Sequence, residues 1–176
     1  MDLTTMVIKA AADLLAVFWV FLFIFGGTLG VLYMGNSLIK MVRATHFAAQ
    51  QPVTLMNIIV VAILGALLVN LDEFINIMLA TFGITGSDYA PIAYAETGDF
   101  GKFADAIDAV LTLASMAGGI FFIRGLIILK RATVDNSPQA ADDVWRAATH
   151  MIGGALLVRN DMFIEAARQT FGLYWN

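Results

Sequence analysis

Long charge-free runs alternate with short polar segments along this chain. The first run, Leu14–Ile39, contains no charged residue and exceeds the roughly 20 apolar residues that a helix needs to span a bilayer. Further apolar runs cover Val53–Leu71, Val110–Leu129 with Arg124 inside it, and Ala147–Val158. The pattern predicts an all-α, polytopic membrane protein with four hydrophobic helices.

The fourth of these predicted helices is the weakest. An arginine at the centre of a span costs about 2.5 to 3.5 kcal/mol, whereas each strongly apolar residue contributes only about 0.3 to 0.6 kcal/mol. The run at Val110–Leu129 is apolar enough to offset Arg124, but Ala147–Val158 has too few strongly apolar residues to offset Arg146. We therefore expect the fourth helix to need the other helices, or neighbouring subunits, to stay inserted.

A segment in the middle of the chain recurs near the C-terminus. Residues 65–84 (GALLVNLDEFINIMLATFGI) and 154–173 (GALLVRNDMFIEAARQTFGL) align without a gap at an offset of 89, with 11 of 20 positions identical. Coincidence between two apolar helices explains GALLV, but not the shared register of Asp, Phe-Ile and Thr-Phe-Gly. The final glycine of each copy is a typical helix stop. We expect residues 53–83 and 142–172 to form the same helix, with the same bend or stop.

This repeat divides the chain into two halves. The first helical repeat covers residues 1–84, in which residues 1–13 are expected to form an N-terminal interfacial helix. An acidic linker follows at 85–100, and the second helical repeat covers 101–176. Each half is a helix, a basic loop and a helix. The two repeats should run parallel, because an even number of spans separates them.

Small residues recur within the apolar runs at a spacing typical of helix contacts. In a bilayer, small residues four positions apart let two helix backbones approach closely, although isolated glycines are also tolerated in membrane helices. The Gly118-Gly119 pair also echoes Gly26-Gly27 in the first half. The residues predicted to pack helices together are Gly26, Gly30, Gly118, Gly119, Gly153 and Gly154.

Composition supports a membrane protein and gives no sign of catalysis. The chain is 60% hydrophobic and 14% charged, against about 25% charged in soluble domains. A net charge of −4 without a basic patch gives no reason to expect direct nucleic-acid binding, and with no cysteine there is no thiolate chemistry. His46 and His150 stand outside any metal-binding motif. We expect that the protein is not an enzyme and that it has no catalytic, metal or cofactor site. The one bound small molecule that the sequence suggests is a phospholipid.

Three charges near the predicted spans are candidates for an ion pair or a lipid-phosphate contact. Intramembrane carboxylates often mark ion pathways, but Asp72 and Asp161 occupy equivalent repeat positions where an apolar run ends. They are therefore better explained as interfacial anchors or partners of another subunit. Arg124 should pair with a carboxylate, reach the interface or bind a lipid phosphate.

The lysines and arginines also predict the orientation of the chain. Lys40 and Arg43 follow the first run, and Lys130 and Arg131 follow the third. Short loops rich in these residues stay in the cytoplasm. Both repeats thus place their basic loop inside the cell, with the acidic linker in the periplasm.

The second repeat resembles a known family. The segments that carry the resemblance are GGIFFIRGLIILKRA at 118–132, AATHMIGGAL at 147–156 and Thr170-Phe171-Gly172. They are similar to the TraQ-like conjugal transfer proteins of I-type plasmids and to the related IcmC/DotE proteins of type IVB secretion systems, which are small inner-membrane proteins. The match is most convincing over 52–84 and 118–172. The family has no catalytic residues to carry over.

The resemblance implies a subunit of a conjugative type IVB secretion apparatus that transfers DNA. Such a subunit would lie in the bacterial inner membrane and contact other components of the machine. The glycine-rich helices and the weak fourth span add that it works as a homo-oligomer in contact with membrane lipid. One variant is a pilin-like subunit that polymerises with bound lipid into an extracellular pilus. The alternative is a small ion or solute transporter or channel, suggested by the duplication and the three charges.

Overall fold

The computed structural model describes residues 3–46, 55–84, 89–94, 103–134 and 139–172 of the chain. Over these ranges every regular element is helical. The helices are α1 (Leu3–His46), α2 (Leu55–Val69), α3 (Leu71–Thr81), α5 (Ala104–Val134), α6 (Ala140–Val158) and α7 (Asn160–Phe171). The predicted linker at 85–100 lies mostly outside the described residues, which include only 89–94 of it.

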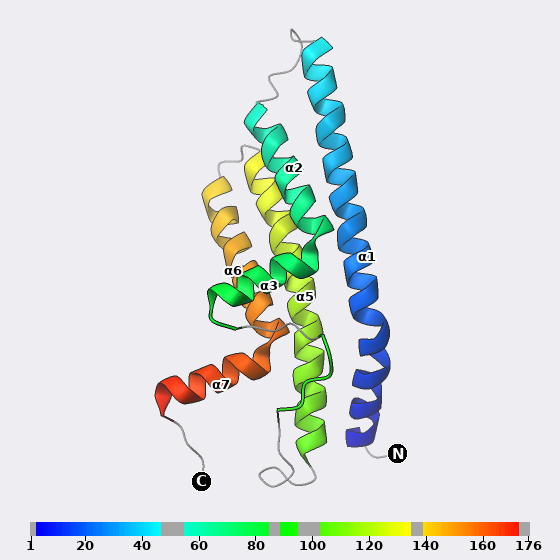
Figure 1. Cartoon of the computed structure of the whole chain (residues 1–176), viewed down its shortest axis with the longest axis vertical. Helices are drawn as coiled ribbons and strands as arrows, with labels where there is room; N and C mark the ends of the chain where they lie inside the picture. The colour runs from blue at the N-terminus through cyan, green and yellow to red at the C-terminus, as the bar shows by residue number, and fades with distance from the viewer. Residues whose placement is uncertain (1–2, 47–54, 85–88, 95–102, 135–138, 173–176) are drawn as a thin grey trace.

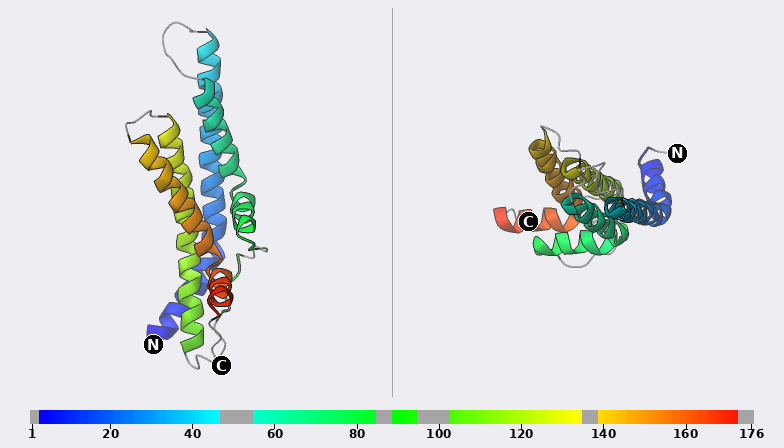
Figure 2. Two further views of the ribbon diagram at one scale, coloured as in Figure 1. Left: turned by 90° about the vertical axis from the view of Figure 1, so that its left-hand side faces the viewer. Right: turned by 90° about the horizontal axis from the view of Figure 1, so that it is seen from above.

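The long helices form two antiparallel hairpins that stand side by side (Figure 1). In the first hairpin α2 returns along α1, and in the second hairpin α6 returns along α5. Both hairpins run in the same direction, as the two views of Figure 2 also show. The C-terminal ends of α1 and α5, which carry the basic residues, therefore lie at the same end of the molecule.

The N-terminal residues do not form a separate interfacial helix. Leu3–Asp13 is continuous with the apolar run in α1, which has 44 residues and is therefore about 66 Å long. No glycine or proline precedes Gly26 in this helix to interrupt it. Lys40 and Arg43 also lie within α1 rather than in a loop.

The second helix of each hairpin breaks at an equivalent position. After Val69 the chain turns by 92° into α3, with Asn70 at φ −104° and ψ 48°. After Val158 it breaks again into α7, with Arg159 at φ −120° and ψ 54°. Asn70 and Arg159 are 89 positions apart. Each second helix is thus two helices joined at a break.

A physical reason for the first break is the amphipathic character of α3. Leu71, Ile75 and Leu79 are buried on one face of this helix, because positions four apart lie on the same side. Asp72 and Glu73 are exposed. A straight continuation of α2 would carry these two carboxylates deeper along the apolar run, whereas the bend lays α3 across the second hairpin with its charges outward.

The stop glycines also fall at equivalent positions. Gly83 has φ 76° and Gly172 has φ 63°, conformations that cost other residues energy because of their Cβ atom. The two glycines are 89 positions apart. The amide of Gly83 donates to the carbonyl oxygen of Ala80, and the amide of Gly172 donates to that of Arg168. Both halves therefore have a helix break and a left-handed glycine at positions 89 residues apart.

Among the described residues, two helices are long and apolar enough to cross a membrane, namely α1 and α5. A third crossing is obtained if the bent pair of α2 and α3 counts as one span. The 15 residues of α2 extend only about 22 Å, less than the hydrocarbon thickness of about 30 Å. Helix α6 is not among the candidate spans, because Asp142, Asp143 and Arg146 occupy its first turns.

The core of the molecule lies where the two hairpins meet. The indole of Trp19 on α1 is buried against α5, and Phe122 on α5 is fully buried. Phe74 on α3 packs edge-to-face on Phe122, with ring centroids 5.3 Å apart. Tyr89 from the linker adds a ring 4.5 Å from Trp19 and 5.0 Å from Phe23.

Candidate functional site

The two helices of the first hairpin approach most closely at a pair of glycines. A methyl group at Gly30 would lie 2.5 Å from the carbonyl oxygen of Gly65 and 2.8 Å from the amide nitrogen of Val69. A methyl group at Gly65 would lie 2.7 Å from Cγ of Met34. Because most of these atoms belong to the backbone, they cannot rotate away. Only glycine permits this contact at either position.

The second hairpin has the same contact. A methyl group at Gly118 would lie 2.7 Å from the carbonyl oxygen of Gly154 and 2.8 Å from the amide nitrogen of Val158. Gly154 and Val158 are 89 positions after Gly65 and Val69. Gly30 and Gly118 therefore play equivalent parts in α1 and α5. We call these two glycine contacts the hairpin seams.

Two further glycines lie between the hairpins. A methyl group at Gly119 would lie 2.9 Å from Leu22 and 3.0 Å from Trp19. One at Gly26 would meet Leu71 at 2.9 Å and Ile123 at 3.7 Å. The nearest of these neighbours are side-chain atoms, and the backbone carbonyl oxygen of Leu68 lies at 3.5 Å from a methyl group at Gly26, so the contacts are less strict than those of the hairpin seams.

Gly153 differs from the other predicted packing glycines. A methyl group at this position would meet nothing within 4 Å, so Gly153 does not lie at a helix contact in the chain. Gly65 and Gly125 do lie at close contacts, although sequence reasoning did not single them out as packing residues. The alignment of Gly65 with Gly154 in the repeat was the signal that could have found the first of them.

Buried polar side chains add hydrogen bonds across each hairpin. The hydroxyl of Ser37 donates to the carbonyl oxygen of Ile58 at 2.6 Å, and that of Ser115 donates to Val158 at 2.8 Å. The side-chain amide of Asn160 donates to the carbonyl oxygen of Leu111 at 2.8 Å. The last carbonyl groups of a helix lack partners within it, and Ser115 supplies one at the end of α6. The bonds from Ser115 and Asn160 lie at the break after Val158, whereas the bond from Ser37 joins α1 to the start of α2.

Asp72 and Asp161, which are equivalent in sequence, have different surroundings. Asp161 accepts two hydrogen bonds from the guanidinium of Arg159, each at 3.2 Å, in a largely buried ion pair. In the first repeat, Asn70 replaces that arginine, and Asp72 is exposed. The backbone carbonyl of Asp72 accepts a 3.4 Å hydrogen bond from the Tyr89 hydroxyl. Burial, and then the nearby carboxylates of Asp72 and Glu73, raise the pKa of Tyr89 above its ordinary value.

Arg124 points away from the rest of the molecule. Its side chain is exposed, and no acidic side chain in the described ranges forms an ion pair with it. The residues beside it on this face of α5, Ile120 and Phe121, are exposed and apolar. Its neighbour Ile123 reaches Gly26, which lies near the middle of the charge-free run of α1. Any partner of Arg124 therefore comes from outside the described part of the chain.

The fold and these contacts define an all-helical membrane protein whose hairpins are held by glycine contacts and buried hydroxyl groups. Within the described residues, no three histidine or carboxylate side chains gather where a metal ion could bind. Comparisons with protein-family models, with curated proteins and with solved structures give no match for the chain.

Proposed function

We propose that this protein is a small integral membrane subunit of a conjugative type IVB secretion apparatus. It would lie in the bacterial inner membrane and work as a homo-oligomer with other components of the machine. The observation that carries the proposal is the place of the segment at 118–132, which resembles the TraQ-like family. Gly118 holds α6, Gly119 contacts α1, and Arg124 faces outward from the same helix.

We further propose that the chain consists of two parallel copies of one helical unit. Support comes from the hairpin seams, from the breaks at Asn70 and Arg159, and from the left-handed glycines at positions 83 and 172. Each unit then comprises a long helix, a shorter returning helix and an amphipathic helix. In this proposal the four hydrophobic helices expected from the sequence correspond to α1, α2, α5 and α6.

A pilin-like role is the form of this proposal that the surface favours. Large apolar side chains are exposed along much of α1, including Val17, Phe21 and Ile24. Such a surface suits either lipid or another subunit. An exposed guanidinium among apolar residues, as at Arg124, suits the phosphate of a lipid headgroup. The subunit would wait in the membrane and polymerise together with phospholipid.

The transporter alternative has less support. An ion pathway needs polar groups that are available to the transported species. The hydroxyls of Ser37 and Ser115 and the amide of Asn160 each donate to a backbone carbonyl across the helix interface. These groups hold helices together. These three buried groups therefore serve packing.

A mating assay tests the proposed function. The coding sequence would be deleted from a donor strain, and transfer of the conjugative element to a recipient would be counted. We expect transfer to fall by orders of magnitude and to return when the wild-type chain is supplied in trans. Transfer at the undiminished frequency in the deletion strain would reject the proposal. Size analysis of the purified protein in mild detergent tests the oligomer separately.

A further inference from the structure

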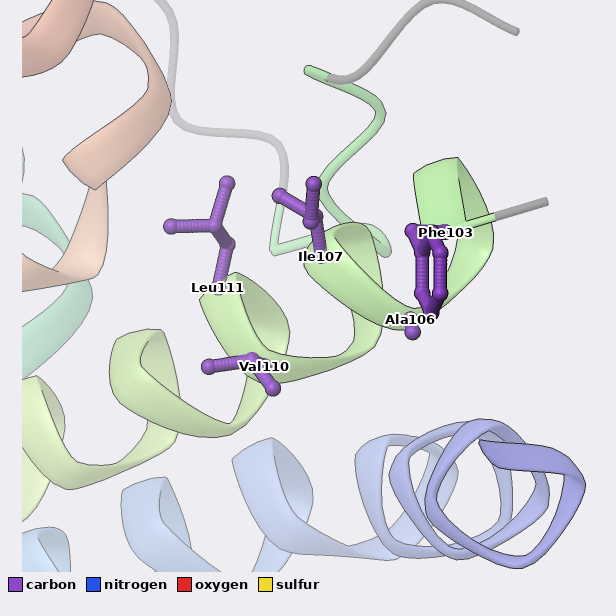
Figure 3. Close-up of a pocket in the computed structure, with 5 residues that line it drawn as sticks. All are labelled: Phe103, Ala106, Ile107, Val110 and Leu111. Carbon is purple, nitrogen blue, oxygen red and sulfur yellow. The ribbon is translucent and has the colours of Figure 1, made fainter. Parts of the chain in front are cut away.

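An open apolar pocket lies near the N-terminal end of α5. It has a volume of about 270 Å³, and Figure 3 shows that its lining residues lie along the first turns of α5, with Phe103 just before the helix begins. They are Phe103, Ala106, Ile107, Val110 and Leu111. The side chains of Phe103 and Val110 are 69% and 56% exposed. Among the described residues, only this side of the pocket is lined.

The equivalent face of α1 is covered. The hairpin seams pair Gly118 with Gly30, so residues of α5 match residues of α1 at an offset of 88. The pocket residues then match Leu15, Phe18, Trp19, Leu22 and Phe23. These residues of α1 are covered by two others. Gly119 of α5 covers Trp19 and Leu22, and Tyr89 of the linker covers Trp19 and Phe23. The second hairpin thus exposes a surface that the first hairpin buries.

The face of α5 that covers α1 also has an exposed counterpart. Gly119 and Ile123 of α5 reach across to α1, and Leu126 on the same face is fully buried. At the offset of 88 these residues match Val31, Gly35 and Leu38. Val31 and Leu38 are 62% and 61% exposed, and a methyl group at Gly35 would meet nothing within 4 Å. The face of α1 that is equivalent to the packing face of α5 is therefore exposed.

The amphipathic helices show the same relation independently. Phe74 on α3 packs on Phe122 of the second hairpin. The counterpart of Phe74 on α7 is Phe163, which is 46% exposed, and the counterpart of Phe122 on α1 is Met34, which is 37% exposed. Figure 1 shows that α7 starts against the second hairpin and then extends away from it.

We propose that a second copy of this chain docks on the second hairpin in the way that the second hairpin docks on the first. Val31, Gly35 and Leu38 of the incoming copy cover Ile107 and Val110, and Phe163 covers Met34 of the incoming copy. The side-chain sizes are complementary in both contacts. Within the chain the small Gly119 faces the large Trp19, and between copies Val31, which is larger than glycine, faces Ile107, which is smaller than tryptophan. The inference rests on the proposed function in its premise that the protein works as an oligomer.

This contact propagates without closing on itself. It joins two different surfaces, and such head-to-tail contacts form rings or open filaments. Within the chain, Gly119 lies against Trp19 and Leu22, whereas its counterpart Val31 is nine to twelve positions further along α1. At 1.5 Å per residue, each hairpin is therefore displaced by about 16 Å along the helix axes. A displacement that accumulates from copy to copy gives a filament.

Cysteine crosslinking tests this contact, because the native chain has no cysteine. The double variant Val31→Cys with Val110→Cys would be treated with a short bismaleimide in donor cells and separated on a denaturing gel. Within one chain the two positions are about 30 Å apart along the helix axes, so a short link between them must join two copies. We expect a ladder of dimers, trimers and larger species, and no ladder from either single variant.

A matched control is the double variant Leu32→Cys with Ile120→Cys. These residues are also exposed and apolar, at 61% and 53%, but lie on another face of α1 and α5. A ladder from the control pair that equals or exceeds that of the test pair would overturn the docking surface. If native gels still show oligomers in that case, the proposed function stands with a different contact. A protein that is monomeric at every concentration would remove the oligomeric premise itself.

Discussion

At the scale of single residues, the structure shows which glycines lie at helix contacts. The sequence alone does not distinguish these glycines from their neighbours. Gly153 and Gly154 are neighbours in one motif, yet only Gly154 lies at a hairpin seam. The sequence echo of Gly26-Gly27 in Gly118-Gly119 also misplaces the register by one helical turn, because the seams pair Gly118 with Gly30. Several glycines at helical spacing fit several registers, and only the opposing backbone selects one.

The adjacent glycines allow a matched test of the seam. In Gly154→Ala, the added methyl would lie 2.7 Å from both the carbonyl oxygen of Gly118 and the amide nitrogen of Phe122. We expect a loss of about 1 to 3 kcal/mol in the free energy of unfolding, measured in detergent by helix loss on heating or with denaturant. Gly153→Ala should be neutral or slightly stabilising, because alanine favours helix. Equal effects of both substitutions would contradict the seam.

Arg124 allows stability and assembly to be separated. Its exposed side chain forms no ion pair within the described ranges, so Arg124→Leu should leave the thermal unfolding of the detergent-solubilised monomer unchanged. Lipid-phosphate binding and assembly should be lost, as read by co-purified phospholipid and by oligomer size. Arg124→Lys should restore them only partly, because lysine cannot bind a phosphate with two parallel hydrogen bonds. Full assembly of Arg124→Leu would show that the charge is incidental.

At the scale of elements, the sequence predicts the helical character of the chain and the stop glycines, whereas the described helices provide two or three of the four expected spans. The 3.6-residue periodicity of α3 and the glycines at 83 and 172 are local signals, and local signals fix where helices end. The breaks after Val69 and Val158 were not located, because neither contains the glycine or proline that usually marks one. They depend on contacts with residues distant in sequence, such as the bond from Ser115 to Val158.

The described part of the linker gives a pH-dependent prediction. The raised pKa of Tyr89 means that the folded protein holds the phenolic proton more tightly than the unfolded chain does. In the unfolded chain the tyrosine has its ordinary pKa of 10.0. The contribution of this group to stability is therefore complete below pH 10 and is lost as the pH rises above it. Tyr89→Phe keeps the ring contacts with Trp19 and Phe23. Unfolding measured between pH 8 and 11 should show a steeper loss for the wild type than for this variant.

At the scale of the whole molecule, the charges at the helix ends predict the orientation in the membrane. Lys40, Arg43, Lys130 and Arg131 all lie near one end of the two hairpins, which favours a cytoplasmic position for that end. The offset of the two hairpins along the helix axes could not be predicted from the sequence, since it depends on which turn of α5 contacts Trp19. Two apolar helices offer many such pairings of similar composition.

Reporter fusions test this orientation. An alkaline phosphatase fused after Ala95 should be active in the periplasm, and one fused after Asn136 should be inactive. A fusion after Asn176 reports on α6. This fusion should be active only if α6 carries the chain across the membrane. Silence after Ala95 together with activity after Asn136 would invert the orientation.

A flat membrane surface would meet the two hairpins at different levels. Helix α3 leaves the bundle level with Phe122, whereas α7 leaves it level with Leu111, and the two levels are about 16 Å apart. This is roughly half the thickness of the hydrocarbon core. A membrane surface that meets α7 must dip to hydrate Asp72 and Glu73 on α3, so the lipid around the protein is deformed at an elastic cost. We therefore expect the protein to concentrate in thin membranes, and extraction into the proposed filament would release the deformation.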